Sequence, residues 1–242
     1  MQADLKTFEH FGTFGTTAIV ALTAQNTLGV RAVHAVPPDF VRAQLAALAE
    51  DLPPAALKTG MLATAELVTT VADAVRGYGW SPLVVDPVMV STSGHRLLTP
   101  DAEAVVRDAL LPLAALVTPN LDEASLLVGR EVRHVAAMEA AGRELVARGA
   151  GAALVKGGHG GGDVVHDVLV TPHGTRRFKR PRLTTTSTHG TGCTLSAAIT
   201  ANLALGHELE DAVTISLDYT WRAIRQAPGL GRGHGPLRHR VT

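Results

Sequence analysis

The stretch Thr188-His189-Gly190-Thr191-Gly192-Cys193-Thr194 runs directly into an apolar segment that ends at Gly206. Apolar residues in that segment recur at helical spacing, and the two glycines let the backbone before it approach a ligand closely. A glycine turn that opens a helix directs unpaired N–H groups, and the positive end of the helix dipole, at one place. The stretch therefore predicts an anion site at a helix start, and phosphate is the usual anion.

A purely structural interpretation of the same stretch also exists. A lone cysteine such as Cys193 is most often a small buried hydrophobic residue, and glycines before helices are common. The pattern G-x-x-x-x-G-K-[ST] does not occur in the sequence, which excludes a P-loop nucleotide-binding protein.

The composition limits the class of protein. The chain has 242 residues, of which 46% are hydrophobic and 18% charged, and its formal net charge is zero. This length suits a single domain over residues 1–242, and neutrality argues against a nucleic-acid partner. One cysteine excludes an internal disulfide, and no apolar run approaches the ~18 residues of a membrane span. We expect a soluble, cytoplasmic protein.

Short apolar runs alternate with helical patterns along the chain. The patterns predict helices over residues 2–11, 39–50, 65–77, 101–111, 137–148, 190–205 and 209–227, with another beginning near Leu121. They predict strands over residues 17–24, 83–87, 115–120 and 152–156, a turn over 58–61, and a hairpin of residues 164–171 and 175–178. Such alternation indicates an α/β fold whose mostly parallel sheet is covered on both faces.

Polar or sulfur-bearing side chains follow the apolar runs. In parallel sheets ligands bind beyond the carboxyl ends of the strands, so these residues should converge. The residues are Gln25 and Asn26, Met61, Asp86, Asn120 and Glu123, and Lys156. Each alone is an ordinary turn residue. Together with the glycine turn they predict one cleft.

Several stretches carry a family resemblance. They are Gln2-Ala3-Asp4-Leu5-Lys6-Thr7-Phe8, Ala24-Gln25-Asn26-Thr27, Lys58-Thr59-Gly60-Met61-Leu62, Val85-Asp86-Pro87-Val88-Met89, Thr118-Pro119-Asn120-Leu121-Asp122-Glu123-Ala124, Lys156-Gly157-Gly158-His159 and the glycine turn. In this order they resemble the hydroxymethylpyrimidine/phosphomethylpyrimidine kinases of thiamine biosynthesis, a branch of the ribokinase-like kinases. The resemblance covers essentially the whole chain and implies a ribokinase-like three-layer αβα sandwich.

The resemblance also implies a reaction in two ATP-dependent steps. The hydroxymethyl group of 4-amino-5-hydroxymethyl-2-methylpyrimidine is phosphorylated first, and the monophosphate is then converted to the pyrophosphate. ATP and Mg²⁺ are the implied cofactors, and relatives usually pair as homodimers.

By the same resemblance, Gln25 would bond the pyrimidine ring and amine, because an amide both donates and accepts hydrogen bonds. Further residues would have the roles of their counterparts. Asp4, Met61 and Val88 would line the substrate pocket, and Asp86, Asn120 and Glu123 would hold Mg²⁺, partly through water. Lys156, Asn120 and Thr188 would bind the nucleotide. The transferring phosphoryl group would be bound by Gly190, Thr191, Gly192 and Cys193.

Two roles are open for Cys193. Most ribokinase relatives carry an aspartate base at this place, and a thiol at a helix N-terminus can ionise near neutrality. Cys193 could therefore accept the substrate proton, which we favour. It could equally be a compact group that leaves room for a second phosphate.

The chain departs from the family pattern in places. The family begins with a strand and a glycine-rich turn before the Gln-Ala-Asp segment, whereas Met1 directly precedes Gln2 here. We expect a misassigned start or a truncated chain. Thr92 and His95 occupy positions at which the family often has lysine and aspartate.

Two alternatives follow. One is a pyridoxine or pyridoxal kinase, because some relatives of this branch accept pyridoxine. The other is a catalytically weak ligand-binding protein, because of the missing front end. We interpret the C-terminal His234, His239, Arg232, Arg238 and Arg240 as a solvated tail.

Overall fold

The computed structural model of the protein describes residues 1–89, 97–158 and 160–241. Its centre is a sheet in the order β3 (Leu57–Thr59), β4 (Leu83–Val85), β5 (Leu116–Val117), β6 (Ala153–Lys156), β7 (Val164–Thr171) and β8 (Gly174–Pro181). Neighbours from β3 to β6 run parallel, and β7 and β8 add an antiparallel hairpin. The mostly parallel sheet and the hairpin are as predicted.

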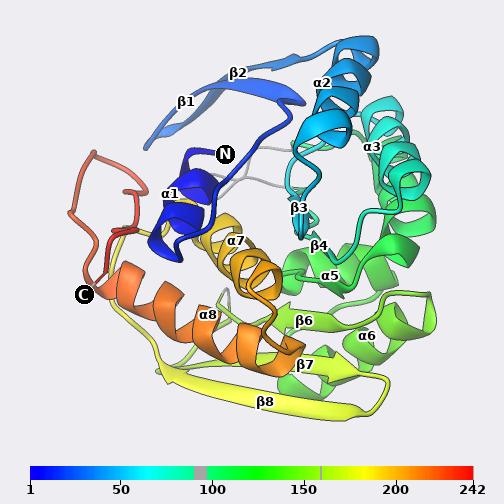
Figure 1. The fold of residues 1–242 in the computed structure, drawn as a ribbon. Coiled ribbons are helices and arrows are strands. Elements are labelled where there is room, and N and C mark those ends of the chain that lie inside the picture. The colour runs from blue at the N-terminus through cyan, green and yellow to red at the C-terminus, as the bar shows by residue number, and fades with distance from the viewer. Residues whose placement is uncertain (90–96, 159, 242) are drawn as a thin grey trace.

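Helices cover both faces of the sheet, and the side chains of β4 show why. Leu83 and Val85 join one apolar core, and Val84 between them joins the other, because successive strand residues point to opposite faces. The first core packs against α2 (Pro38–Asp51), α3 (Ala65–Tyr78), α5 (Leu121–Val128) and α6 (Val135–Ala147); the second packs against α7 (Thr191–Ala204) and α8 (Leu209–Arg225). The result is the predicted αβα sandwich (Figure 1).

The helix predicted over residues 101–111 is divided into three pieces. They are α4 (Pro100–Val105), a π-helical turn η1 (Val106–Leu110) and a 3₁₀ turn η2 (Leu111–Leu113). Pro112 lies in the last piece and has no N–H to continue an α-helical pattern.

The predicted buried strand over residues 17–24 is wrong. The strand β1 (Ala21–Asn26) is mostly exposed and pairs antiparallel with β2 (Gly29–Ala35) in a two-stranded ribbon apart from the central sheet (Figure 1). Asn26 Oδ1 accepts a hydrogen bond from the Leu28 N–H at 2.9 Å, which closes the turn between the strands. The turn predicted over residues 58–61 begins instead inside a strand, because Lys58 and Thr59 belong to β3.

The N-terminal helix α1 (Gln2–His10) packs against α7 and reaches α8. The His10 ring stacks on Tyr219 of α8 at 4.5 Å, and Phe11 meets the same ring edge-on at 5.0 Å. Among the described ranges, no helix is both long and apolar enough to cross a membrane.

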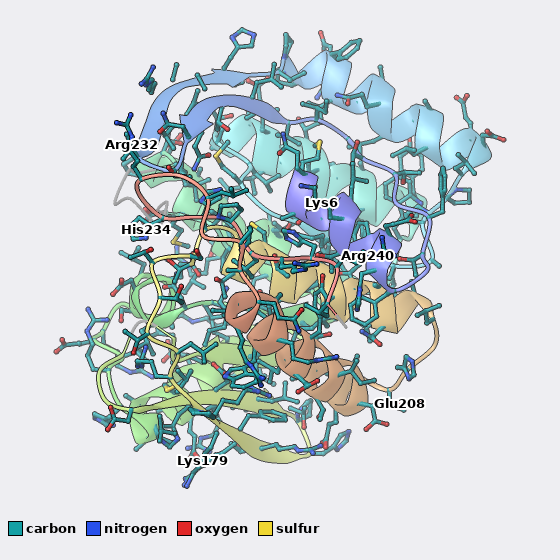
Figure 2. The ribbon with its side chains drawn as sticks, turned by 90° about the vertical axis from the view of Figure 1, so that its left-hand side faces the viewer. Lys6, Lys179, Glu208, Arg232, His234 and Arg240 are labelled. Carbon is teal, nitrogen blue, oxygen red and sulfur yellow. The ribbon has the colours of Figure 1, made fainter. Side chains whose placement is uncertain are left out.

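The C-terminal segment packs through its apolar residues, whereas the charged residues predicted to be solvated are largely exposed. Arg232, His234, Arg238 and Arg240 are exposed as predicted, and His239 is half-buried. Leu237 and Val241 are buried beside Tyr219. The His234 N–H donates to the Thr27 carbonyl of the ribbon turn at 2.8 Å, and His239 Nε2 lies 3.1 Å from Thr194 Oγ1. Figure 2 shows Arg232 and His234 on this segment beside the ribbon. The apolar residues interleaved with the charged ones account for the packing.

Candidate functional site

The residues predicted to bind substrate, nucleotide, metal and phosphoryl group line one cavity of about 1830 Å³, whereas Asn26, also predicted at the cleft, does not line it. The residues that meet there are Asp4, Gln25, Met61, Asp86, Val88, Asn120, Glu123, Lys156, Thr188, Gly190, Thr191, Gly192 and Cys193. Gln25 and the glycine turn therefore face the same space. Ligand pockets usually measure ~300–1,000 Å³, so this cavity has room for two ligands side by side.

The parallel strands bring several of these residues to one edge of the sheet. Asp86 directly follows β4, and its N–H donates to the Thr59 carbonyl of β3 at 3.0 Å. Asn120 follows β5 and forms a parallel bridge with Lys156, the last residue of β6. The predicted convergence at the carboxyl ends is confirmed for these strands. Gln25 reaches the cavity differently, from the separate ribbon.

The glycine turn opens α7 with its first amides uncovered. Gly190 has φ +80°, a conformation that favours glycine, and Thr191 Oγ1 donates to the Thr188 carbonyl at 2.8 Å. No side chain caps the helix, and within the described ranges the N–H groups of Gly192 and Cys193 have no protein acceptor. These amides lie at the positive end of the helix dipole, which suits a phosphate.

A buried ion pair stands beside this helix start. Lys156 Nζ lies 2.9 Å from Asp86 Oδ1, which also accepts from Thr118 Oγ1 at 3.2 Å. Asp86 is 2% exposed. Burial opposes its ionisation, but Lys156 and then Lys58 hold the pKa of this carboxyl below its ordinary value.

Gly192 brings the start of α7 close to the ion pair. A Cβ atom placed on Gly192 would lie 3.1 Å from Lys156 Nζ and 3.6 Å from Asp86 Oδ2. The absence of a side chain thus lets the open amides and the Lys156 ammonium serve the same anion.

Asn120 and Glu123 form a capping box at the start of α5. Asn120 Oδ1 accepts from the N–H groups of Asp122 and Glu123, and Glu123 Oε2 accepts from the Asn120 N–H at 2.8 Å. Burial raises the pKa of Glu123 to about 7, against the opposing effect of Lys156. The carboxyl is therefore partly protonated near neutral pH.

Cys193 stands in the first turn of α7, inside the cavity. Burial raises the pKa of the thiol, although Lys58 and the helix start favour the thiolate. The surroundings thus oppose the ionisation near neutrality that the helix start led us to expect, because desolvation disfavours the thiolate.

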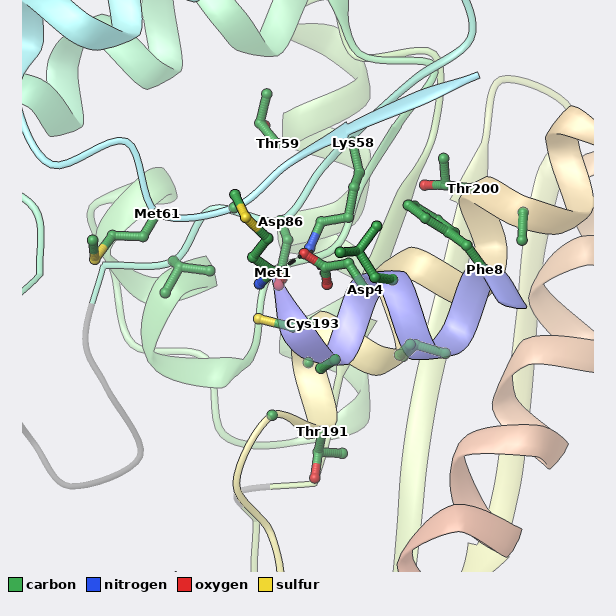
Figure 3. A pocket seen from close by; sticks show the side chains of 18 of the residues that line it. Met1, Asp4, Phe8, Lys58, Thr59, Met61, Asp86, Thr191, Cys193 and Thr200 are labelled. Atoms are coloured by element: carbon green, nitrogen blue, oxygen red, sulfur yellow. Dashed lines mark hydrogen bonds and ion pairs between the residues drawn. The ribbon is translucent and has the colours of Figure 1, made fainter. Parts of the chain in front are cut away.

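Lys58 is a site residue that received no predicted role. Its Nζ lies 3.1 Å from Asp4 Oδ1, and its side chain is 7% exposed (Figure 3). The predicted pocket residue Asp4 is thus also the partner of a buried cation. A lysine at the end of a short apolar run was the available signal, but a strand lysine is usually solvent-exposed.

The predicted metal ligands do not form a dense cluster. In the part of the chain that the structure describes, no group of three or more His, Cys, Asp or Glu side chains is arranged to hold a metal. Lys156 interacts with both Asp86 and Glu123. Thr92 and His95 lie outside the described residues.

Comparison with known proteins gives consistent matches. The family model described as phosphomethylpyrimidine kinase matches residues 1–238. A hydroxymethylpyrimidine/phosphomethylpyrimidine kinase of Rhizobium meliloti is 47% identical over 242 residues, covering 99% of this chain and 91% of the relative. The thiamine biosynthesis bifunctional protein ThiED of Geobacter sulfurreducens is 45% identical over 99% of this chain, which spans about half (49%) of that protein's length.

Solved structures of phosphomethylpyrimidine and pyridoxal kinases share the fold. The phosphomethylpyrimidine kinase of Clostridium difficile is 40% identical, with a TM-score of 0.82 over 92% of each chain. The pyridoxal kinase of Bacillus subtilis, solved as an ADP complex, is 33% identical with a TM-score of 0.91 over 100% of this chain and 92% of the other. The chain, with its glycine turn at the start of α7 and its buried Asp86–Lys156 pair, belongs to the phosphomethylpyrimidine kinase family of ribokinase-like phosphotransferases.

Proposed function

We propose that the protein phosphorylates 4-amino-5-hydroxymethyl-2-methylpyrimidine with ATP and then phosphorylates the resulting monophosphate to the pyrophosphate, in thiamine biosynthesis. The observation that carries this proposal is the shared cavity, in which the amide side chain of Gln25 and the open amides of α7 face one space. One element would recognise a flat heterocycle, and the other a phosphoryl group.

Phosphoryl transfer requires alignment and charge neutralisation more than covalent chemistry from the protein. The N–H groups of Gly192 and Cys193, together with Lys156, would neutralise the transferring group. Met61 and Val88 would hold the ring, and Asn120 and Thr188 would contact the nucleotide. The proposal keeps Cys193 as the proton acceptor, with its compact-group role as the alternative.

Mg²⁺ is part of this proposal. Asp86 and Glu123 supply the oxygen donors that this ion prefers, but both carboxylates already accept hydrogen bonds from the protein. Carboxylates that are already hydrogen-bonded suit an ion that keeps several of its water ligands and binds together with the nucleotide phosphates. Bound there, Mg²⁺ would neutralise phosphate charge.

A pyridoxine or pyridoxal kinase is the second candidate. The TM-score of 0.91 to a solved pyridoxal kinase exceeds the 0.82 to the Clostridium difficile phosphomethylpyrimidine kinase, whereas identity favours the latter, 40% against 33%. The higher overall identity favours the pyrimidine substrate.

A coupled ADP assay separates the candidates. The pyrimidine alcohol, its monophosphate and pyridoxine are offered in parallel with ATP and Mg²⁺. We expect the highest kcat/KM with the pyrimidine compounds. A higher kcat/KM with pyridoxine would overturn the substrate assignment, and ligand binding without ADP release would indicate the catalytically weak relative.

The proposal also includes a homodimer in the cytoplasm, where ATP and the pyrimidine would be available. Light scattering on the purified protein at micromolar concentration tests the first part. A mass of about one chain, 25.3 kDa, would contradict the dimer.

A further inference from the structure

Lys58 is a buried cation at the bottom of the cavity. It is the middle residue of β3, and its ammonium points toward α1, close to Asp4 and Cys193 (Figure 3). Gly60 lies beside the ammonium: a Cβ atom placed on it would be 3.7 Å from Lys58 Nζ, an ordinary contact distance. The cation thus lines the cavity while its side chain remains 7% exposed.

A structural role alone does not account for this lysine. An ion pair buried at this depth is weak evidence for stability, because apolar residues of similar volume usually serve a core as well. An ammonium has three N–H groups, and one donates to Asp4 Oδ1 at 3.1 Å. Across the described ranges no second protein acceptor lies within hydrogen-bond distance of Lys58 Nζ.

The charges around Lys58 keep it protonated. Burial opposes the charged form, but Cys193, Asp4 and Asp86 together raise the pKa of Lys58 above its ordinary value. Lys156 stands on the other side of Asp86, paired with it at 2.9 Å. Two ammonium groups therefore line the cavity, Lys58 paired with Asp4, which also pairs with the Met1 amino group, and Lys156 paired with Asp86.

The two proposed steps differ in the charge of their acceptor. The first acceptor is a neutral alcohol, whereas the second is a phosphate monoester with nearly two negative charges. In the second step an oxygen of that monoester attacks the γ-phosphorus of ATP, and the bond to the leaving ADP breaks with its electron pair on ADP. Two anionic groups must therefore meet in one cavity, which requires more positive charge than the first step.

We propose that Lys58 binds the phosphate of the monophosphate acceptor, so that it serves the second phosphorylation and contributes little to the first. The inference rests on the proposed function. Lys156 and the α7 amides hold the group in transfer, and Lys58, on the Asp4 side, offers its remaining N–H groups to the acceptor phosphate. Lys58 transfers no proton in this role.

Lys58→Met and Lys58→Arg test the inference, with the exposed Lys179→Met on β8 as the matched control (Figure 2). We expect Lys58→Met to lower kcat/KM for the monophosphate about 100-fold, mainly through KM, and for the alcohol less than about fivefold. Lys58→Arg should restore most of the loss, and Lys179→Met should change neither value.

Lys58→Gln, which removes the charge but keeps a polar end that can bond Asp4, continues the test if Lys58→Met does not fold. An equal loss with both acceptors, or no loss with either, would overturn the assignment of Lys58 while leaving the proposed function intact. Failure of the unmodified chain to use either acceptor would overturn the proposed function, and the inference with it.

Discussion

Two buried ion pairs stand at the centre of the site. Asp86 is paired with Lys156, and Asp4 with Lys58, at 2.9 and 3.1 Å. Removing one member of such a pair leaves an uncompensated buried charge, which costs about 3–5 kcal/mol. A phosphate entering between them meets cations that are already positioned.

The thiol of Cys193 allows a direct test, because the sequence contains one cysteine. If the thiol is the proton acceptor, Cys193→Ala should lower the first-step kcat by about 10²–10⁴-fold, the usual contribution of general base catalysis. Single-turnover ADP release measures this step. A rate within about twofold of the unsubstituted enzyme would instead support the compact-group role.

Glu123 predicts a pH dependence of stability. Its pKa is about 7 in the folded protein against an ordinary value of 4.5, so the folded state binds more protons than the unfolded state between these values. The stabilisation is therefore present at low pH and is lost as pH rises through about 7, by up to about 3 kcal/mol. The free energy of unfolding, measured by urea denaturation between pH 5 and 8, tests this dependence.

Glu123→Gln should flatten this part of the profile, with exposed Glu50→Gln as the control. If the free energy of unfolding of Glu123→Gln falls with pH as steeply as that of the unsubstituted protein, other groups cause the pH dependence.

Helix α7 combines a buried middle with an open start. Residues 194–202 are all buried, whereas 190–193 are only half-buried and face the cavity. Packing of the buried turns against the sheet and α8 holds the first turn in place without a capping side chain. The amides stay free for a ligand because tertiary packing, not a cap, stabilises the helix.

Gly192→Ala should separate stability from activity at this helix start. Alanine in place of a helical glycine stabilises by about 1 kcal/mol, but its Cβ would lie 3.1 Å from Lys156 Nζ, inside the anion site. We expect an unchanged or higher melting temperature and at least a tenfold lower kcat/KM for ATP.

Gly77→Ala in α3 is the matched control, because its Cβ would meet nothing within 4 Å and Gly77 does not line the cavity. Unchanged activity in Gly192→Ala would show that phosphate binds elsewhere.

At the scale of the whole molecule, the cavity joins parts that are distant in sequence. The ribbon supplies Gln25, the sheet edge supplies Asp86 and Lys156, and the C-terminal segment contacts Thr27 on the ribbon turn. His234 Nδ1 also lies 3.2 Å from Thr188 Oγ1, so the same segment touches the glycine turn. Ligands in the cavity would therefore contact most layers of the fold.

Binding should accordingly stabilise the whole chain. At 100 times its Kd a ligand contributes about 2.7 kcal/mol, which for a chain of this size raises Tm by roughly 5–10 °C. Differential scanning fluorimetry with the pyrimidine alcohol, a non-hydrolysable ATP analogue and both together measures the shift. No shift with either ligand, at concentrations that saturate activity, would contradict binding in this cavity.

Much of the central architecture was predictable because it depends on local patterns. Val84 and its neighbours form a continuous apolar run, which indicates a strand buried on both faces, and the glycines before α7 mark a helix start. The ribbon was not predictable in this way, because residues 17–24 are apolar enough for a buried strand. Residues of β1 are exposed because β1 pairs with β2 in a ribbon outside the central sheet.

The sequence by itself determined the alternation of helices and buried strands from α3 to β6, the glycine turn before α7 and the residue types at the strand ends, since these depend on periodicity and on the conformations that glycine permits. Only the tertiary structure decided that burial raises the pKa values of Glu123 and Cys193 and that Lys58 pairs with Asp4. Burial and charge separation depend on distances between segments that the chain order does not specify.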